Sequence, residues 1–326
     1  VLLREDSAEV LGRVVHSPSR NVRRQIVRRG LEKTGDHHAR LVPLGIDSED
    51  AVIRLACCRH LTEAYDEERL TEVFDRLTND RYMPVRREAL RRKAEQFPKA
   101  ATEIWKQALL DRHRSIRDLA CWHIAKKGSE SPSTLYRNAI HKSPKLLPAL
   151  EGLAETCDES DIEFFRHLLE HPTPSRRCVA VRGLVRIGKA SSINEVLPLL
   201  RDESPRVVRA VWKAIGPHLQ DVPRGELFTV ALDGKNLVAR HTAITILADM
   251  GKWESLPWLL RIASEAKADT AAHAEQIIRK VCACNSVFTK PSKSATEKIT
   301  WELERSKHFV AEEVQDLVKA ELSRFG

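Results

Sequence analysis

The sequence lacks several features that would place it in a familiar class. No stretch approaches the roughly 18 consecutive apolar residues of a membrane-spanning helix, so we expect no membrane partner. Glycine contributes only 13 of 326 residues, too few for a collagen-like chain, and aromatic residues make up only 5%. Hydrophobic residues at 42% with charged residues at 31% exclude a disordered polymer. A chain of this length has about two domains, unless it is a repeat array that grows by stacking.

Motifs of the common enzyme classes are also missing. The sequence has no P-loop, no Gly-rich dinucleotide turn, no Gly-x-Ser-x-Gly and no His-Glu-x-x-His. Cys282 and Cys284 have no second pair of ligands nearby, so we expect no zinc, no other metal and no cofactor. These absences weaken the case for an enzyme without closing it, and catalytic residues stay unassigned.

The cysteines and the N-terminus bear on localisation. Seven cysteines, an odd number, lie mostly among apolar residues at helical spacing, which predicts buried thiols in a reducing compartment. The chain starts with residues 1–6, VLLRED, without the basic region and apolar core of a signal peptide. We therefore expect a cytoplasmic protein. The first residue is not Met, which leaves upstream domains open.

An internal repeat of about 31 residues organises the chain. Residues 202–216 read as a turn, a proline and then a helix with apolar residues at helical spacing. Similar segments recur at intervals of 30 to 33 residues when they are aligned on one position, here called the anchor. The anchors are Val22, Val52, Val85, Ile116, Leu146, Arg176, Val207, Val238 and, more weakly, Thr270.

Each repeat has the pattern of two amphipathic helices. Positions 0, +4, +8 and +11 from the anchor lie on one helix face, and prolines before several anchors suit a first turn. A second amphipathic segment separates successive anchored helices, for example residues 66–77 and 193–200. No sustained alternation of apolar and polar residues indicates a strand. The sequence therefore predicts an all-α protein.

The pattern resembles the HEAT-like repeat family, in the short form also found in phycobilin lyases. The pairs Val22-Arg23, Val85-Arg86 and Ile116-Arg117 carry the resemblance, which covers roughly residues 5–284. It implies a right-handed α-solenoid of about nine two-helix repeats over residues 1–285. We expect residues 286–326 to form a linker and a C-terminal helical cap. The Leu146 unit departs most, because it has Pro148 and no arginine, and we expect a bend there.

Positive charge is concentrated in the anchored helices. Fourteen residues from each of the first eight anchors hold 23 Lys and Arg against 10 Asp and Glu, a net +13. The remaining positions hold 31 against 36, a net −5, within a total of +8. In proteins of the HEAT-like type the second helix of each repeat lines the concave face. The resemblance therefore implies a positive inner surface that favours acidic partners.

The candidate binding residues lie at +2 and +6 from the anchors, on one stripe away from the core. The +2 residues are Arg24, Arg54, Arg87, Arg209 and Arg240, and the +6 residues are Arg28, Arg91, Trp122, Arg182 and Lys213. The arginine at +1 is typically structural in the HEAT-like family, so we expect it to bond turn carbonyls or the Asp of a neighbouring repeat. Burial between repeats is the competing role for Trp122.

The leading functional hypothesis is a non-catalytic scaffold whose basic surface binds an acidic protein or peptide. The competing explanation, a solvated face that keeps the array soluble, does not account for the sorting of charge by helix. Nucleic-acid binding is the alternative, although aromatic residues are few and Glu151 and Glu155 interrupt the stripe. HEAT-like DNA glycosylases are similar in architecture only, and no motif carries their catalytic residues over. A bilin lyase is conceivable from the repeat type alone.

Overall fold

The chain folds into two compact units, residues 1–152 and residues 153–326. The computed structural model describes residues 17–32, 36–128, 130–284 and 290–324. The boundary between the units falls within α10 (Leu147–Thr156), in the repeat that departs most from the sequence pattern. No strand occurs in the described residues, which confirms the all-α prediction.

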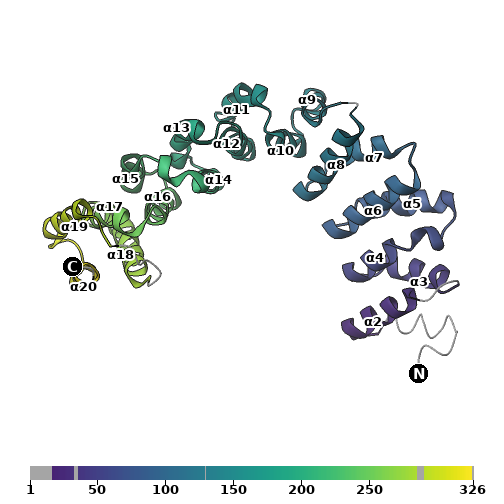
Figure 1. Cartoon of the computed structure of the whole chain (residues 1–326), viewed down its shortest axis with the longest axis horizontal. Helices are drawn as coiled ribbons and strands as arrows, with labels where there is room; N and C mark the ends of the chain where they lie inside the picture. Colours follow the sequence, from purple (N-terminus) through teal and green to yellow (C-terminus); the bar gives the residue numbers. More distant parts are fainter. Residues whose placement is uncertain (1–16, 33–35, 129, 285–289, 325–326) are drawn as a thin grey trace. The chain divides into compact units, whose positions relative to one another are not determined.

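Unit 1 stacks helix pairs in two layers (Figure 1). The first helices of the pairs are α3 (Asp36–Ile46), α5 (Glu67–Thr78), α7 (Ala101–Ala108) and α9 (Pro132–Lys142). The second helices are α2 (Arg20–Leu31), α4 (Ala51–Cys58), α6 (Met83–Gln96) and α8 (Arg114–Lys127), followed by the first part of α10. A short 3-10 turn, η1 (Leu61–Glu63), links α4 to α5.

Local sequence explains where these helices begin and end. Asp66 caps α5 by accepting a hydrogen bond from the Arg69 backbone N–H, and Pro84 occupies the first turn of α6 as predicted. Gly128 ends α8 with φ +68°, a left-handed conformation that favours glycine. In α10 a Cβ on Gly152 would lie 2.2 Å from the Tyr136 ring, so this close approach of α9 and α10 requires glycine.

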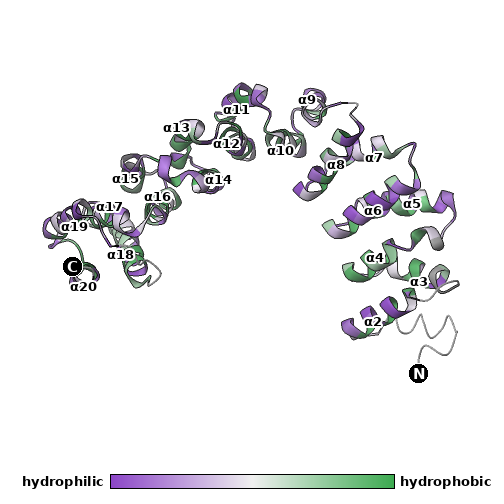
Figure 2. Ribbon diagram, in the orientation of Figure 1, coloured by the Kyte–Doolittle hydropathy of each residue, from purple (hydrophilic) through white to green (hydrophobic). Residues whose placement is uncertain are grey.

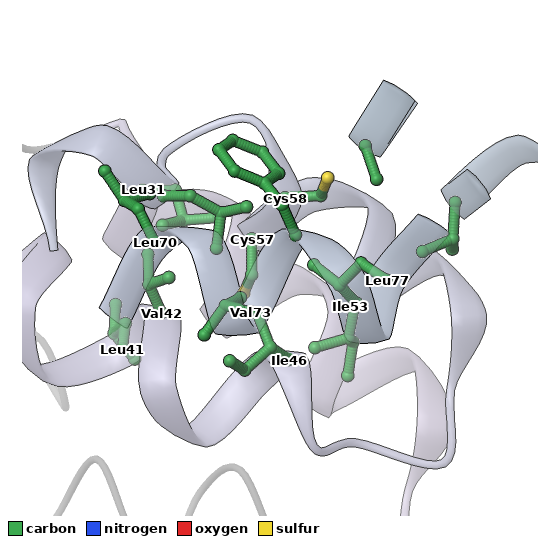
Figure 3. Close-up of a cluster of buried hydrophobic side chains, with 14 of the residues drawn as sticks. Leu31, Leu41, Val42, Ile46, Ile53, Cys57, Cys58, Leu70, Val73 and Leu77 are labelled. Carbon is green, nitrogen blue, oxygen red and sulfur yellow. The ribbon is translucent and has the colours of Figure 1, made fainter. Parts of the chain in front are cut away.

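The core of unit 1 runs between the two layers (Figure 3). Leu41, Ile53 and Cys57 are at most 1% exposed, and Phe74 from α5 is fully buried among them. Burying each such side chain contributes about 1.5–3 kcal/mol to folding. Helix α6 contacts both α5 and α7, and the second helices α2, α4 and α6 pack against one another in order.

Unit 2 continues the same two-helix repeat. Its α-helices are α11 (Ile162–Leu168), α12 (Pro174–Gly188), α13 (Ile193–Val196), α14 (Pro205–Ile215), α15 (Arg224–Asp233), α16 (Leu237–Asp249), α17 (Lys252–Glu265), α18 (Ala268–Ala283), α19 (Lys293–Ser306) and α20 (Glu312–Ser323). Its 3-10 segments are η2 (Glu159–Asp161), η3 (Lys189–Ser192), η4 (Leu197–Arg201) and η5 (Gly216–Asp221). The helix predicted over residues 193–200 is split into α13 and η4, where Pro198 cannot donate a backbone hydrogen bond.

The last two helices pack onto the final repeat: α19 contacts α17, and α20 contacts α18. A buried ion pair fixes α20, because Lys252 Nζ lies 2.6 Å from Glu321 Oε2 with both side chains at most 8% exposed. Two helices were expected in this region, but residues 285–289 of the predicted linker lie outside the described residues. In the described part of the chain, no helix is long and apolar enough to span a membrane.

Candidate basic interaction surface

In most repeats, one arginine forms hydrogen bonds that link its helix to the next repeat. Arg54 donates from Nε and Nη2 to both carboxylate oxygens of Asp80, at 2.7 and 2.9 Å. Its Nη1 donates backwards to the carbonyl oxygens of Ser48 and Glu49, at 2.7 and 2.9 Å. The guanidinium therefore closes its own turn and clamps the turn of the following repeat, and it is only 9% exposed.

The same arrangement recurs along both units, and we call these residues the inter-repeat arginines. Arg86 pairs with Asp111 at 2.8 and 2.8 Å, and Arg177 pairs with Asp202 at 2.7 and 2.8 Å. Arg117 donates to the Asp111 carbonyl and lies 3.4 Å from Glu151. These contacts confirm the structural role expected for the arginine at +1. Arg23 bonds the turn carbonyls of Ser17 and Pro18.

Two of the Asp side chains that pair with arginines, Asp80 and Asp50, have lowered pKa values. Burial alone would raise the pKa of Asp80, but hydrogen bonds from Arg54 and the Tyr82 backbone N–H hold it below its ordinary value. In the first repeat, the hydrogen bond from Arg24 is the main cause that holds the pKa of Asp50 well below its usual range. Arg20 also donates to Asp50, at 3.0 Å. Both carboxylates therefore stay ionised throughout the physiological range.

Three of the predicted anchors, Val22, Val52 and Val238, are displaced by one residue. Ile53 is 1% exposed whereas Val52 is 48% exposed, so Ile53 is the core residue of α4. In α16, Ala239 is fully buried and takes the place assigned to Val238. This shift moves Arg54 and Arg240 from +2 to +1, the position of the inter-repeat arginines. Arg240 accordingly bonds the Gly234 carbonyl and Thr270 Oγ1, at 2.8 and 3.0 Å.

Three of the ten predicted binding residues therefore have their guanidinium groups engaged within the array. Besides Arg54 and Arg240, Arg24 donates to both oxygens of Asp50, at 2.7 and 2.9 Å. The predicted anchor of α2, Val22, is 42% exposed whereas Val27 is 1% exposed, so the core register of α2 is also one residue later than predicted and Arg24 stands at +1, while Arg23 bonds the turn carbonyls. The two functions of a single inter-repeat arginine are thus shared by adjacent residues in α2.

The other seven predicted residues lie at or near the surface. Arg87, Arg209 and Lys213 are exposed and form no ion pair with any described residue. Arg28 is exposed and lies 3.5 Å from Glu32, while Arg91 is half-buried and pairs with Glu88 and Glu95. Arg182 lies half-buried on α12, and Trp122 is 56% exposed on α8.

Correcting the anchor of α4 brings out Arg59, which the sequence reasoning missed. Arg59 stands at +6 from Ile53, is 55% exposed at the side chain, and lies 3.9 Å from Glu88. Glu88 also accepts from Arg91 at 2.7 Å, so one carboxylate brings Arg59 and Arg91 together across α4 and α6. No signal in the sequence identified Arg59, because Val52 and Ile53 are both β-branched and apolar.

These exposed residues form what we call the unit 1 basic stripe. It consists of Arg28, Arg59, Arg87 and Arg91, with Trp122 at the corresponding position of α8. Trp122 is not buried between repeats: its indole lies 5.1 Å from Lys126 Nζ and edge-on to His123. His123 in turn stacks on the buried Trp105, and this contact holds the His123 ring in place beside Trp122.

The two helix layers of unit 1 differ in net charge. Helices α2, α4, α6 and α8 carry 15 Lys and Arg against 3 Asp and Glu, whereas α3, α5, α7 and α9 carry 6 of each. Hydrophilic residues recur along α2, α6 and α8, while α4 is mostly hydrophobic (Figure 2). The inter-repeat arginines explain only part of this excess, so the exposed cations need another reason.

Unit 2 carries its own smaller basic patch. Helices α12 and α14 pack together and contain seven Lys and Arg without an acidic residue. Arg209 and Lys213 are exposed on α14, one turn apart, and Arg182 lies on the neighbouring α12. In the described residues no group of three or more His, Cys, Asp or Glu side chains could hold a metal ion.

Comparison with known proteins bears on the fold. A search of curated protein sequences found no match. Importin beta, crystallised in a polyethylene glycol condition, is similar at 13% identity and a TM-score of 0.41, over 97% of this chain. The Escherichia coli protein YibA is similar at 14% identity and a TM-score of 0.31, over 95% of this chain and 98% of its own. This chain spans 51% of the importin beta chain, about half its length.

Because both TM-scores are low, the fold assignment rests on the helix pairs and on a family match. The model of HEAT repeats matches residues 162–224, which run from α11 to the start of α15. This segment contains two successive helix pairs and the Arg177–Asp202 contact between them. Each unit is built of stacked helix pairs, and residues 162–224 match the model of HEAT repeats.

Proposed function

We propose that the chain is a non-catalytic binding scaffold whose unit 1 basic stripe binds an acidic segment of a partner protein. The observation that carries this proposal is the separation of the second-helix arginines into two groups. The inter-repeat arginines are buried and bonded between repeats, whereas Arg28, Arg59 and Arg87 are exposed and the half-buried Arg91 pairs with Glu88 and Glu95 of its own helix. Stacking of the repeats requires the first group and leaves the second available for binding.

The dimensions of the stripe suit an extended peptide. Packed helices lie about 8–10 Å apart, and a peptide in the polyproline II conformation has three residues per turn and advances about 3.1 Å per residue. Acidic side chains at every third residue would therefore meet successive helices. Each guanidinium can bind a carboxylate through two hydrogen bonds, and exposed Trp122 offers an apolar contact beyond the last arginine.

A matched pair of variants tests the proposal. The probe is a labelled peptide with Glu at every third residue and a Leu at one end, followed by fluorescence anisotropy. Arg59→Glu with Arg87→Glu should weaken binding at least about tenfold, the effect of losing one or two charge-assisted hydrogen bonds. Arg69→Glu with Arg76→Glu places the same charge change at exposed positions of α5 and should leave binding unchanged. Equal loss in both variants would indicate a general charge effect and contradict the proposal.

Nucleic-acid binding is the second candidate, favoured by the exposed Trp122 beside Lys126. A base could stack on this indole while the stripe follows the phosphates. The discriminating quantity is the dependence of affinity on salt. A nucleic acid should show a log–log slope close to the number of phosphates contacted, whereas an acidic peptide should show a shallower one.

The patch of Arg182, Arg209 and Lys213 on α12 and α14 is proposed as a further contact for an acidic partner.

The state of the cysteines supports a cytoplasmic location for this binding. All seven are free thiols, and four of them are buried, which suits a reducing compartment such as the cytoplasm.

A further inference from the structure

Unit 2 contains a cleft that has no part in the basic surfaces. It has a volume of about 450 Å³ and lies between α17 and α19, with the first residue of α15 at one side. The two long helices pack side by side (Figure 1). A volume of this size is in the range of sites for small organic ligands.

The walls of the cleft are aromatic. Trp301 on α19 is 61% exposed, with the Arg305 guanidinium 5.4 Å from its ring. Trp258 on α17 packs against Phe228, with ring centroids 5.7 Å apart, and also lines the cleft. A planar ring bound between such walls gains about 1–3 kcal/mol from stacking.

A buried carboxylate in the cleft lacks a hydrogen-bond donor. Glu302 is 7% exposed, and its Oε2 has no hydrogen-bond partner among the described residues. The Arg305 Nη1 atom lies 3.6 Å away, too far for a hydrogen bond. Burial raises the pKa of Glu302, which reflects the cost of leaving this group unsatisfied. A ligand with N–H donors would remove that cost.

Cations without partners complete the lining. Arg224 and Lys298 form no ion pair with a described residue, and the buried Nε of Arg224 has no hydrogen-bond partner. A third cation, Arg261, is bound to Glu265 at 3.0 Å. With the exposed Glu254 and with Glu302, the lining holds three cations and two carboxylates, a net +1. An anionic group on the ligand would be balanced by Arg224 and Lys298.

We propose that this cleft binds a guanine nucleotide. The purine stacks between Trp258 and Trp301, its N1–H and N2 amino groups donate to Glu302, and its phosphates meet Arg224 and Lys298. Guanine is favoured because its base-pairing edge presents two adjacent donors to the two carboxylate oxygens. Adenine presents one donor beside the N1 acceptor, which an ionised carboxylate repels.

The test is direct binding of a fluorescent N-methylanthraniloyl GTP to the full chain, with competition by unlabelled compounds. GTP should compete at least about tenfold better than ATP and inorganic triphosphate. Glu302→Gln should remove the preference for guanine, and Trp301→Ala should weaken binding about tenfold. Phe309→Ala, which removes an exposed ring outside the cleft lining, should have no effect on this binding.

The source of the nucleotide is resolved by a further competitor, a short RNA that begins with a 5′-triphosphate guanosine. Competition equal to that of GTP would indicate the free nucleotide, and competition at least about tenfold stronger would indicate the 5′ end of an RNA. The proposal is overturned if GTP does not bind at about 1 mM or if inorganic triphosphate competes equally well. Unchanged guanine preference in Glu302→Gln, with an unaltered thermal melt, would also overturn it.

Discussion

Arg54 of α4 donates hydrogen bonds to both carboxylate oxygens of Asp80, the residue in the turn before α6. Its remaining donors meet the carbonyl oxygens of Ser48 and Glu49. A guanidinium bonded on both sides in this way has little capacity left for a partner protein. The relationship separates two kinds of arginine that look alike in the sequence: those that hold the repeats together and those that face solvent.

The first prediction concerns stability. Arg54→Ala should lower the free energy of unfolding by about 3 kcal/mol, because it leaves the nearly buried Asp80 without its ion pair. Arg69→Ala, at an exposed position of α5, should change it by less than about 0.5 kcal/mol. Urea unfolding followed by circular dichroism measures both. A loss below about 1 kcal/mol in Arg54→Ala would argue against a structural role.

Acid should weaken the first repeats of unit 1 through Asp50. Because the folded pKa of Asp50 is depressed, its stabilising contribution is fully present above the unfolded value of about 3.9 and is lost as pH falls towards the folded pKa. Asp50→Asn should therefore be less stable than the wild type at pH 7. The difference should narrow as the pH is lowered below about 4, in urea midpoints measured at several pH values. A constant difference would show that the ionisation of Asp50 does not matter.

A second pH effect should appear in unit 2 near neutrality. His241 on α16 and His273 on α18 stack with centroids 3.8 Å apart, and burial lowers the pKa of both. The nearby charges of Arg240 and Lys280 add to this effect, while Asp269 opposes it at His241. Since the folded pKa values are depressed, stability should fall as pH drops through the unfolded value of about 6.5.

The matched variant for this effect is the double substitution His241→Phe and His273→Phe, which keeps two stacked rings without titratable nitrogens. The wild type should lose free energy of unfolding between pH 7.5 and pH 5, and the variant should lose less. Parallel pH profiles for the two proteins would refute the assignment to this pair.

The fourth prediction tests how the C-terminal helices are held. Glu321→Ala should lower the free energy of unfolding of unit 2 by about 3 kcal/mol, because Lys252 would be left as a buried charge without its partner. Lys319→Ala removes an exposed charge from the same helix and serves as the control. Hydrogen exchange of α20 reports the change directly. Unaltered protection of α20 in Glu321→Ala would mean that apolar packing alone holds it.

Much of the fold could be predicted from the sequence because each repeat contains its own helix signals. Prolines at the first turns of α6, α12 and α14 and apolar residues every three or four positions define the helix pairs without distant information. The role of the +1 arginine was also predictable, since the Asp of the next turn follows Arg86 and Arg177 by 25 residues.

The binding residues were harder to predict because a helix face depends on an exact register. Val52 and Ile53 are both β-branched and apolar, and only their burial distinguishes them. Choosing Val52 rotated the assignments in α4 by one residue, so Arg54 was taken for a surface residue and Arg59 was missed. The cleft beside Glu302 was beyond sequence reasoning, because it depends on how α19 returns to pack against α17.

Two adjacent arginines of α6, Arg86 and Arg87, represent the two kinds side by side. Arg86 is 4% exposed at the side chain and bonded to Asp111, whereas Arg87 faces solvent without an ion pair to any described residue. The measurement is the thermal melt and the acidic-peptide affinity of Arg86→Ala and Arg87→Glu side by side. We predict that Arg86→Ala lowers the melting temperature, and that Arg87→Glu weakens binding while its melt is unchanged. Wild-type affinity in Arg87→Glu, or a matching loss of stability in both variants, would contradict the division into structural and binding arginines.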